Sequence, residues 1–111
     1  MRTAMTVRIS PSGPMLSPFF AKCQFVLFLD PDGVAQEWIR NYERQSAILA
    51  AWILGEGVRR LVCGFIDPVA AAALLGAGLD VRIGPCDLPV REVLQLFEAL
   101  PRARDGASAG G

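Results

Sequence analysis

The spacing of hydrophobic residues predicts three strands in the first part of the chain. Apolar and polar residues alternate over 5–10, which is typical of a strand, and a nearly continuous apolar run over 24–30 predicts a strand buried on both faces. The turn at 30–33 (DPDG) leads into a second alternating stretch, 34–40, which predicts an edge strand whose charges discourage pairing with another sheet. The proline-rich stretch 11–18 is expected to be a loop.

The second part of the chain predicts helices that alternate with short strands. A helical period places four apolar residues of the segment 44–57 on one face, namely Ile48, Leu49, Trp52 and Ile53. Two short strands, 61–63 and 80–83, flank an alanine-rich helix that begins at Asp67-Pro68, with Val69, Leu74 and Leu75 on its buried side. A last helix, capped by Asp87, carries an apolar stripe.

This order of elements predicts one α/β domain over residues 1–100, with a disordered tail over 101–111. A strand, a helix and a second strand form a right-handed crossover that pairs the two strands in parallel, and helices must cover such a pair. The predicted architecture is therefore a five-stranded mixed sheet with three helices packed on it.

Composition excludes several classes of function. Eleven basic and eleven acidic residues balance, so no net charge draws the protein to nucleic acid or to a membrane. The longest apolar run, 47–54, is too short to cross a bilayer, and residues 1–14 do not resemble a signal peptide. A cytoplasmic, reducing location is expected.

The absence of histidine argues against an enzyme. No Ser/His/Asp or Cys/His arrangement is possible, and the commonest general base is missing. The predicted turn and the helix caps account for Asp30, Asp67 and Asp87, whereas Asp80 has no assigned role, and the first strand contains no acid. A two-metal nuclease site is therefore not predicted.

The candidate chemistry lies in three cysteines, an odd number that predicts free thiols. Thiolates are soft ligands that suit iron–sulfur clusters, Cu(I) or zinc. Buried cysteines more often serve as small apolar residues, so packing is an alternative for each of the three. Packing is favoured for Cys63, which ends a core strand, and slightly for Cys23, whereas Cys86 lies in a GPCD loop where exposure is equally expected.

Three segments carry a resemblance to a known family: 61–70 (LVCGFIDPVA), 79–94, and 16–25 (LSPFFAKCQF). Together they resemble the dinitrogenase iron–molybdenum cofactor biosynthesis family, the NifX/NafY-type carriers and their small stand-alone relatives, over about residues 5–100. The resemblance implies a ribonuclease-H-like fold with strand order 3-2-1-4-5, in which strand 2 is antiparallel to the others. Where the family often has histidine, phenylalanine and glycine, this chain has Pro18, Phe19 and Phe20.

The strand order that the resemblance implies has a consequence for the thiols. Cys23 would start strand 2, Cys63 would end strand 4 and Cys86 would follow strand 5, so all three would lie at one edge of the sheet, where open α/β sheets bind ligands. We expect Cys23, Cys63 and Cys86 as ligands of a metal or cluster and Phe19 as a further contact residue, with the loop 15–22 as a lid.

The resulting hypothesis is a non-enzymatic cytoplasmic carrier or accessory protein. It would bind iron–molybdenum cofactor or an iron–sulfur cluster precursor and interact with metallocluster assembly or acceptor proteins. The alternative is a protein-interaction module of the same fold that has lost cofactor binding, since Pro18 replaces the family histidine.

Overall fold

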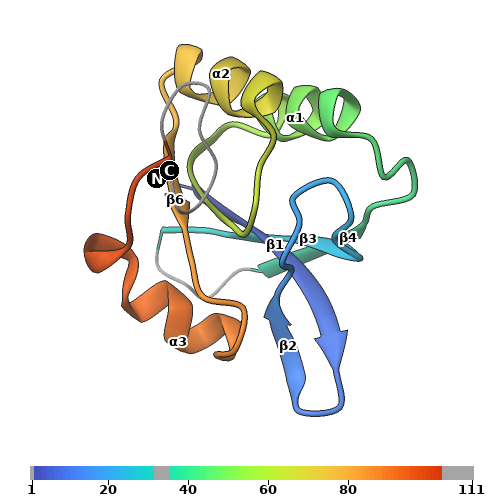
Figure 1. The fold of residues 1–111 in the computed structure, drawn as a ribbon, viewed down its shortest axis with the longest axis vertical. Coiled ribbons are helices and arrows are strands. Elements are labelled where there is room, and N and C mark those ends of the chain that lie inside the picture. Colours follow the sequence, from blue (N-terminus) through green and yellow to red (C-terminus); the bar gives the residue numbers. More distant parts are fainter. Residues whose placement is uncertain (1, 32–35, 104–111) are drawn as a thin grey trace.

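The computed structural model describes residues 2–31 and 36–103 (Figure 1). Strands and helices follow one another in this order: β1 Arg2–Ser10, β2 Gly13–Leu16, β3 Phe25–Leu29, β4 Gln36–Arg40, α1 Ser46–Gly55, β5 Val58–Cys63, α2 Pro68–Gly76, β6 Asp80–Ile83, α3 Val90–Gln95 and the 3-10 helix η1 Phe97–Ala99. The second half of the predicted turn at 30–33 and the start of the predicted strand 34–40 lie outside the described residues.

The sheet has the predicted mixed topology, but it has six strands in the described residues rather than the predicted five. Its strands are ordered β4-β3-β1-β5-β6, with β3 antiparallel to β1 and β4, and β5 parallel to both β1 and β6. Numbered without β2, this is the expected order 3-2-1-4-5. The central strand β1 is long enough to contact three others, because its second half also pairs with β2.

Strand β2 corrects the expectation of a loop over residues 11–18. It forms a hairpin with β1, in which Val7 lies opposite Leu16 and Ser10 opposite Gly13. The turn tightens at Gly13, whose φ of +106° suits glycine. Prolines at the ends of the segment hid this strand, although an edge strand tolerates proline.

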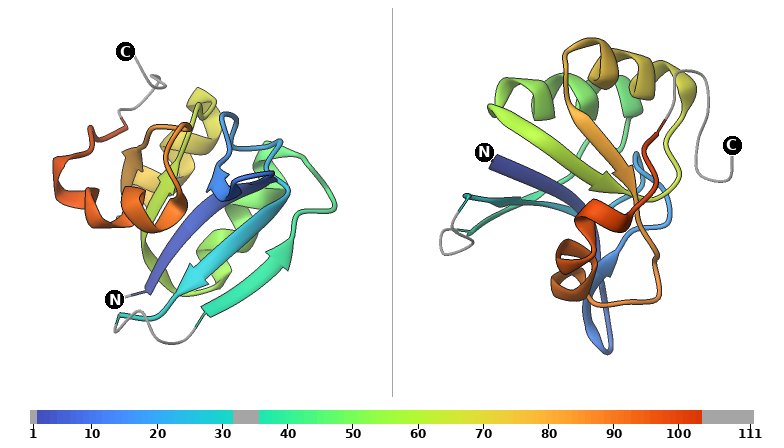
Figure 2. Two further views of the ribbon diagram at one scale, coloured as in Figure 1. Left: turned by 90° about the horizontal axis from the view of Figure 1, so that it is seen from below. Right: turned by 90° about the vertical axis from the view of Figure 1, so that its left-hand side faces the viewer.

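Two apolar layers hold the helices to opposite faces of the sheet. Helices α1 and α2 lie side by side on one face, and α3 lies on the other (Figures 1 and 2). The first layer includes Leu49 and Ile53 of α1 and Leu74 of α2, and the second includes Val93 and Phe97. Three helices on a mixed sheet were predicted, and the structure shows them.

Two details of the helices differ from the prediction. Val69, expected in the core, is 75% exposed, and Ala70 and Ala71 are buried instead, because small side chains let α2 approach the sheet. Asp87 does not cap α3: the N-cap is Pro89, which makes no side-chain cap. Asp67 caps α2 as predicted, accepting a hydrogen bond from Ala70 N at 3.1 Å.

The chain after η1 returns along β6 and closes that edge of the sheet. Ile83 N donates to Pro101 O at 2.9 Å, and Ala103 N donates to Val81 O at 2.8 Å. The buried Arg82 guanidinium donates to the carbonyl oxygens of Phe97 and Leu100. Residues 101–103 are therefore part of the domain rather than of the predicted tail, and residues 104–111 lie outside the description.

One buried polar group on β1 is unsatisfied. The Thr6 hydroxyl is fully buried, and no described residue is within hydrogen-bond distance of it. The nearby Thr3 is also buried, but its Oγ1 accepts a hydrogen bond from Arg60 Nε at 3.0 Å. The two threonines are therefore suited to comparison: both are buried on β1, and only Thr3 has a hydrogen-bond partner for its side chain.

We predict that Thr6→Val raises the free energy of unfolding by about 1–2 kcal/mol, because it removes a buried polar group that lacks a partner. The control Thr3→Val should lower it, since Arg60 loses an acceptor. Urea unfolding of the two variants measures both effects. An equal loss of stability in the two variants would show that Thr6 has a partner.

Candidate functional site

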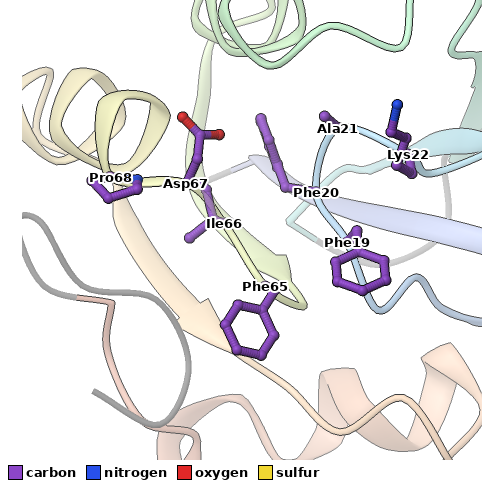
Figure 3. A pocket seen from close by; sticks show the side chains of 8 residues that line it. All are labelled: Phe19, Phe20, Ala21, Lys22, Phe65, Ile66, Asp67 and Pro68. Atoms are coloured by element: carbon purple, nitrogen blue, oxygen red, sulfur yellow. The ribbon is translucent and has the colours of Figure 1, made fainter.

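A shallow cavity opens at the edge of the sheet where β5 ends. Two loops form it: the connection from β2 to β3, and the connection from β5 to α2. Its volume is about 600 Å³, and its walls are mostly apolar. Figure 3 shows the eight residues that line it, which are Phe19, Phe20, Ala21, Lys22, Phe65, Ile66, Asp67 and Pro68.

Backbone hydrogen bonds join the two loops directly. Phe20 N donates to Phe65 O, and Phe65 N donates to Pro18 O, both at 2.7 Å. Gly64 allows this contact, because a Cβ at that position would lie 2.5 Å from Pro18 O and closer still to Ser17 O. The two loops are therefore joined by an isolated parallel β-bridge between Phe19 and Phe65.

Aromatic side chains line the outer part of the cavity. The rings of Phe19 and Phe65 lie with their centroids 6.3 Å apart and a tilt of 37°, and each side chain is about half exposed. Phe20 and Ile66 are both buried beside them. The bonded backbones of the two loops therefore hold two half-exposed apolar rings at the surface.

The charged groups of the cavity have different environments. Lys22 is exposed, and its carbonyl oxygen accepts a hydrogen bond from Arg44 Nη2 at 2.9 Å, which brings two cations to this wall. Asp67 accepts hydrogen bonds from Ser46 Oγ and Ala70 N. Burial alone would raise the pKa of Asp67, but these hydrogen bonds outweigh it and lower the pKa below its ordinary value.

Two of the predicted site residues lie in the core. Cys23 and Cys63 are fully buried in the layer beneath α1 and α2. Burial raises the pKa of Cys23 to about 11, although Asn41 Nδ2 donates to its sulfur at 3.5 Å. Burial also raises the pKa of Cys63 well above its ordinary value. Both thiols are therefore protonated near pH 7 and shielded from ligands.

Cys86 is the partly accessible thiol of the three. It follows β6 as expected, and its carbonyl oxygen lies 3.5 Å from Arg8 Nη2. Burial raises its pKa, and the nearby Arg8 opposes the shift. In the described part of the chain, no three Cys, Asp, Glu or His side chains are grouped so that they could hold a metal ion. The strand order brings the three cysteines to one edge, and Cys63 lies near enough to both others that their charges would raise its pKa further.

The sequence predicted one ring of the cavity and missed its partner. Phe19 was expected as a contact residue and lies on the wall, and the loop that carries it forms half of the cavity. Phe65 was not predicted as a site residue. Its signal was the preceding Gly64, because a glycine between a strand and a helix can mark a close approach of another chain segment.

Comparison with known proteins identifies the family. The family described as "Dinitrogenase iron-molybdenum cofactor" matches residues 1–100. The chain belongs to this family. A search of curated proteins finds no match. In the described residues, no helix is long and apolar enough to cross a membrane.

Solved structures of other proteins share this fold. The apo form of the orange protein from Desulfovibrio gigas is similar with a TM-score of 0.81 and 26% identity, covering 96% of this chain and 95% of that one. A Thermotoga protein of the DUF35 family, described as a candidate NifB protein, is similar with a TM-score of 0.73, 20% identity and 91% coverage of both chains. The second likeness shows a shared fold.

We predict that Gly64→Ala destabilises this family member by roughly 1–3 kcal/mol, because the new methyl group would force the two loops apart. Gly76→Ala is the matched control: it lies at the end of α2, and a Cβ there meets nothing within 4 Å. Thermal unfolding of both variants is the measurement. Equal stability of the two would contradict the close contact between the loops.

The buried thiols predict a loss of stability at alkaline pH. Cys23 has an ordinary pKa of 9.0 and a folded-state value of about 11, so the folded chain binds its proton more tightly than the unfolded chain. Stability is therefore unaffected below about pH 8 and falls by about 2–3 kcal/mol as the pH rises through 9–11. Urea unfolding at several pH values measures this dependence.

Variants separate the thiols in that experiment. Cys23→Ala should reduce the alkaline loss without abolishing it, because burial also raises the pKa of Cys63. Cys86→Ala should reduce it less, because Cys86 is only partly buried. An unchanged pH dependence in Cys23→Ala would show that the Cys23 thiol titrates normally in the folded protein.

Proposed function

We propose that the protein is a non-enzymatic carrier or accessory protein, located in the cytoplasm, that binds iron–molybdenum cofactor or an iron–sulfur precursor as its cargo. The observation that carries the proposal is the aromatic cavity at the ligand-binding edge of the sheet, in a member of a family described by that cofactor. We also propose that the fold is ribonuclease-H-like, as the family resemblance implies.

The lining of the cavity suits a metal–sulfide cluster that is held without covalent ligands from the protein. Sulfide surfaces are polarisable, and aromatic rings such as Phe19 and Phe65 attract them through dispersion and sulfur–aromatic contacts. Lys22 supplies positive charge at the rim for an anionic cargo, and Arg44 is bonded to its backbone, whereas the Asp67 carboxylate on the other loop opposes this attraction. A carrier that holds its cargo in this way can release it without breaking a metal–sulfur bond to its own chain.

The cysteines contribute to this proposal unequally. A cluster that used Cys23 or Cys63 as ligands would need the core to open and each thiol to lose a tightly held proton. Cys86 is reachable without such a change, so we propose it as the thiol available for a single additional contact. Metallocluster assembly or acceptor proteins are the proposed partners.

The second candidate function is a protein-interaction module. The half-exposed Phe19 and Phe65 favour it, because paired apolar rings on a surface also serve as protein contacts. Pro18, at the place of the family histidine, uses its carbonyl oxygen to hold Phe65 N. Such a module would take up no cluster.

Anaerobic incubation with isolated iron–molybdenum cofactor, and separately with ferrous iron and sulfide, tests the proposal. We expect visible absorption that co-elutes with the protein in gel filtration. Phe19→Ser and Phe65→Ser should each lower the bound cofactor about tenfold, which corresponds to the loss of one well-packed ring at a binding site. Metal analysis of the eluted protein gives the amount bound.

Two further variants separate the possible binding modes. Tyr42→Ser removes an aromatic residue that is 80% exposed and lies outside the cavity, so it should leave uptake unchanged. Cys86→Ser should reduce uptake only modestly. If Cys86→Ser bound no cofactor while Phe19→Ser bound the normal amount, the cofactor would be held by the Cys86 thiolate and not by the aromatic rings. No uptake in the unmodified protein would favour the interaction module.

A further inference from the structure

The two edges of the sheet differ in their exposure. At one edge, β6 is covered by residues 101–103, which bond to it through Ile83 N and Val81 O. At the other edge, β4 pairs with β3 alone among the described strands. Four of its five residues are exposed (Figures 1 and 2). Of these two edges, the β4 edge is therefore the one open to a partner among the described residues. The hairpin strand β2 lies off this path, and Met15 bridges to Pro89.

The register of β4 shows which backbone groups face outward. Asn41 N donates to Gln24 O at 2.9 Å, in the register that pairs Phe25 with Arg40. Because hydrogen-bonding direction alternates along an antiparallel strand, Ile39 and Glu37 also face β3. The N–H and C=O groups of Gln36, Trp38 and Arg40 consequently point away from the sheet.

Apolar hollows lie on both sides of this edge. On the α3 face, Trp38 borders a cavity of about 600 Å³ together with Leu27 and Leu29. On the α1 face, Ile39 borders a smaller cavity of about 250 Å³. Trp38 itself is 40% exposed. A strand added at this edge would therefore gain apolar contacts on both faces as well as backbone hydrogen bonds.

Charge is distributed unequally along the edge. At the Gln36 end, the carboxylates of Asp30, Glu37 and Glu56 surround the single guanidinium of Arg2, at 3.0–3.6 Å.

At the opposite end of the strand, Arg40 is followed by Arg44, which bonds to the backbone of Lys22, with Glu43 as the acid between them. One end of β4 is thus net acidic and the other net basic. An antiparallel second copy would place the basic end of each chain against the acidic end of the other.

We infer that two copies of this chain associate through antiparallel pairing of their β4 strands about a twofold axis at Trp38. Opposite residues in an antiparallel pair point to the same face, so the symmetry permits Trp38 opposite Trp38 and Gln36 opposite Arg40 of the other copy. About six backbone hydrogen bonds and an aromatic cross-strand pair result. Because the twofold arrangement uses the β4 edge of both copies, it closes at the dimer.

The charged residues of β4 do not block this pairing. They were expected to prevent pairing between sheets, but Glu37 is held by Arg2, and Arg40 lies over the rings of Phe25 and Tyr42. Neither charge is buried in the sheet face, so neither excludes a partner strand. The loop cavity with Phe19 and Phe65 lies outside the paired edge and stays open in both copies.

Sedimentation equilibrium of the full chain over a range of concentrations tests the dimer. We expect a reversible monomer–dimer equilibrium that weakens as salt rises, since the ends of the strand attract each other electrostatically. Arg40→Glu should raise the dimer dissociation constant about tenfold. The double variant Gln36→Arg/Arg40→Glu should restore association, because it exchanges the two ends of the facing pair.

The control is Arg102→Glu, the same charge reversal on an exposed residue at the covered β6 edge, which should leave the equilibrium unchanged. Circular dichroism confirms that each variant is folded. A monomer at every soluble concentration would overturn the inference. Equal weakening by Arg40→Glu and Arg102→Glu, or no recovery in the double variant, would also overturn it.

Discussion

The contact between two loops at Gly64 is the constraint on which the site depends. Phe65 can bond to Pro18 and Phe20 only because no side chain separates the two backbones. That contact joins the segment after β2 to the segment after β5, which are distant in sequence, and it fixes two phenylalanine rings beside each other. The sheet supplies the framework, since β1 separates β3 from β5 and sets the spacing of the loops.

Burial determines what the remaining chemistry can do. Cys23 and Cys63 lie at the ligand-binding edge by topology, yet their side chains fill the core, and burial keeps both thiols protonated. We therefore propose the aromatic cavity, which is open without rearrangement, as the binding site. The positions of Cys23 and Cys63 can serve either as ligands or as packed core residues, and in this structure both side chains are packed in the core.

Much of the fold could be predicted because its signals are local. The aspartate–proline start of α2 and the apolar periods each act within a few residues. The β2 hairpin was missed because its prolines indicate a loop, and the exposure of Val69 because helical period alone does not show how closely α2 approaches the sheet. The site was predicted only in part: Phe19 follows from a family motif, whereas its pairing with Phe65 is a contact between distant segments that no local pattern encodes.

Amide chemical shifts of the labelled protein during titration with tetrathiomolybdate test the central claim most directly, because this diamagnetic anion presents a metal–sulfide surface. We expect the largest shifts at the amides of Phe19, Phe20 and Phe65, the residues of the joined loops. Shifts centred on Cys86 and β6, with these loops unchanged, would contradict the claim that the aromatic cavity is the binding site.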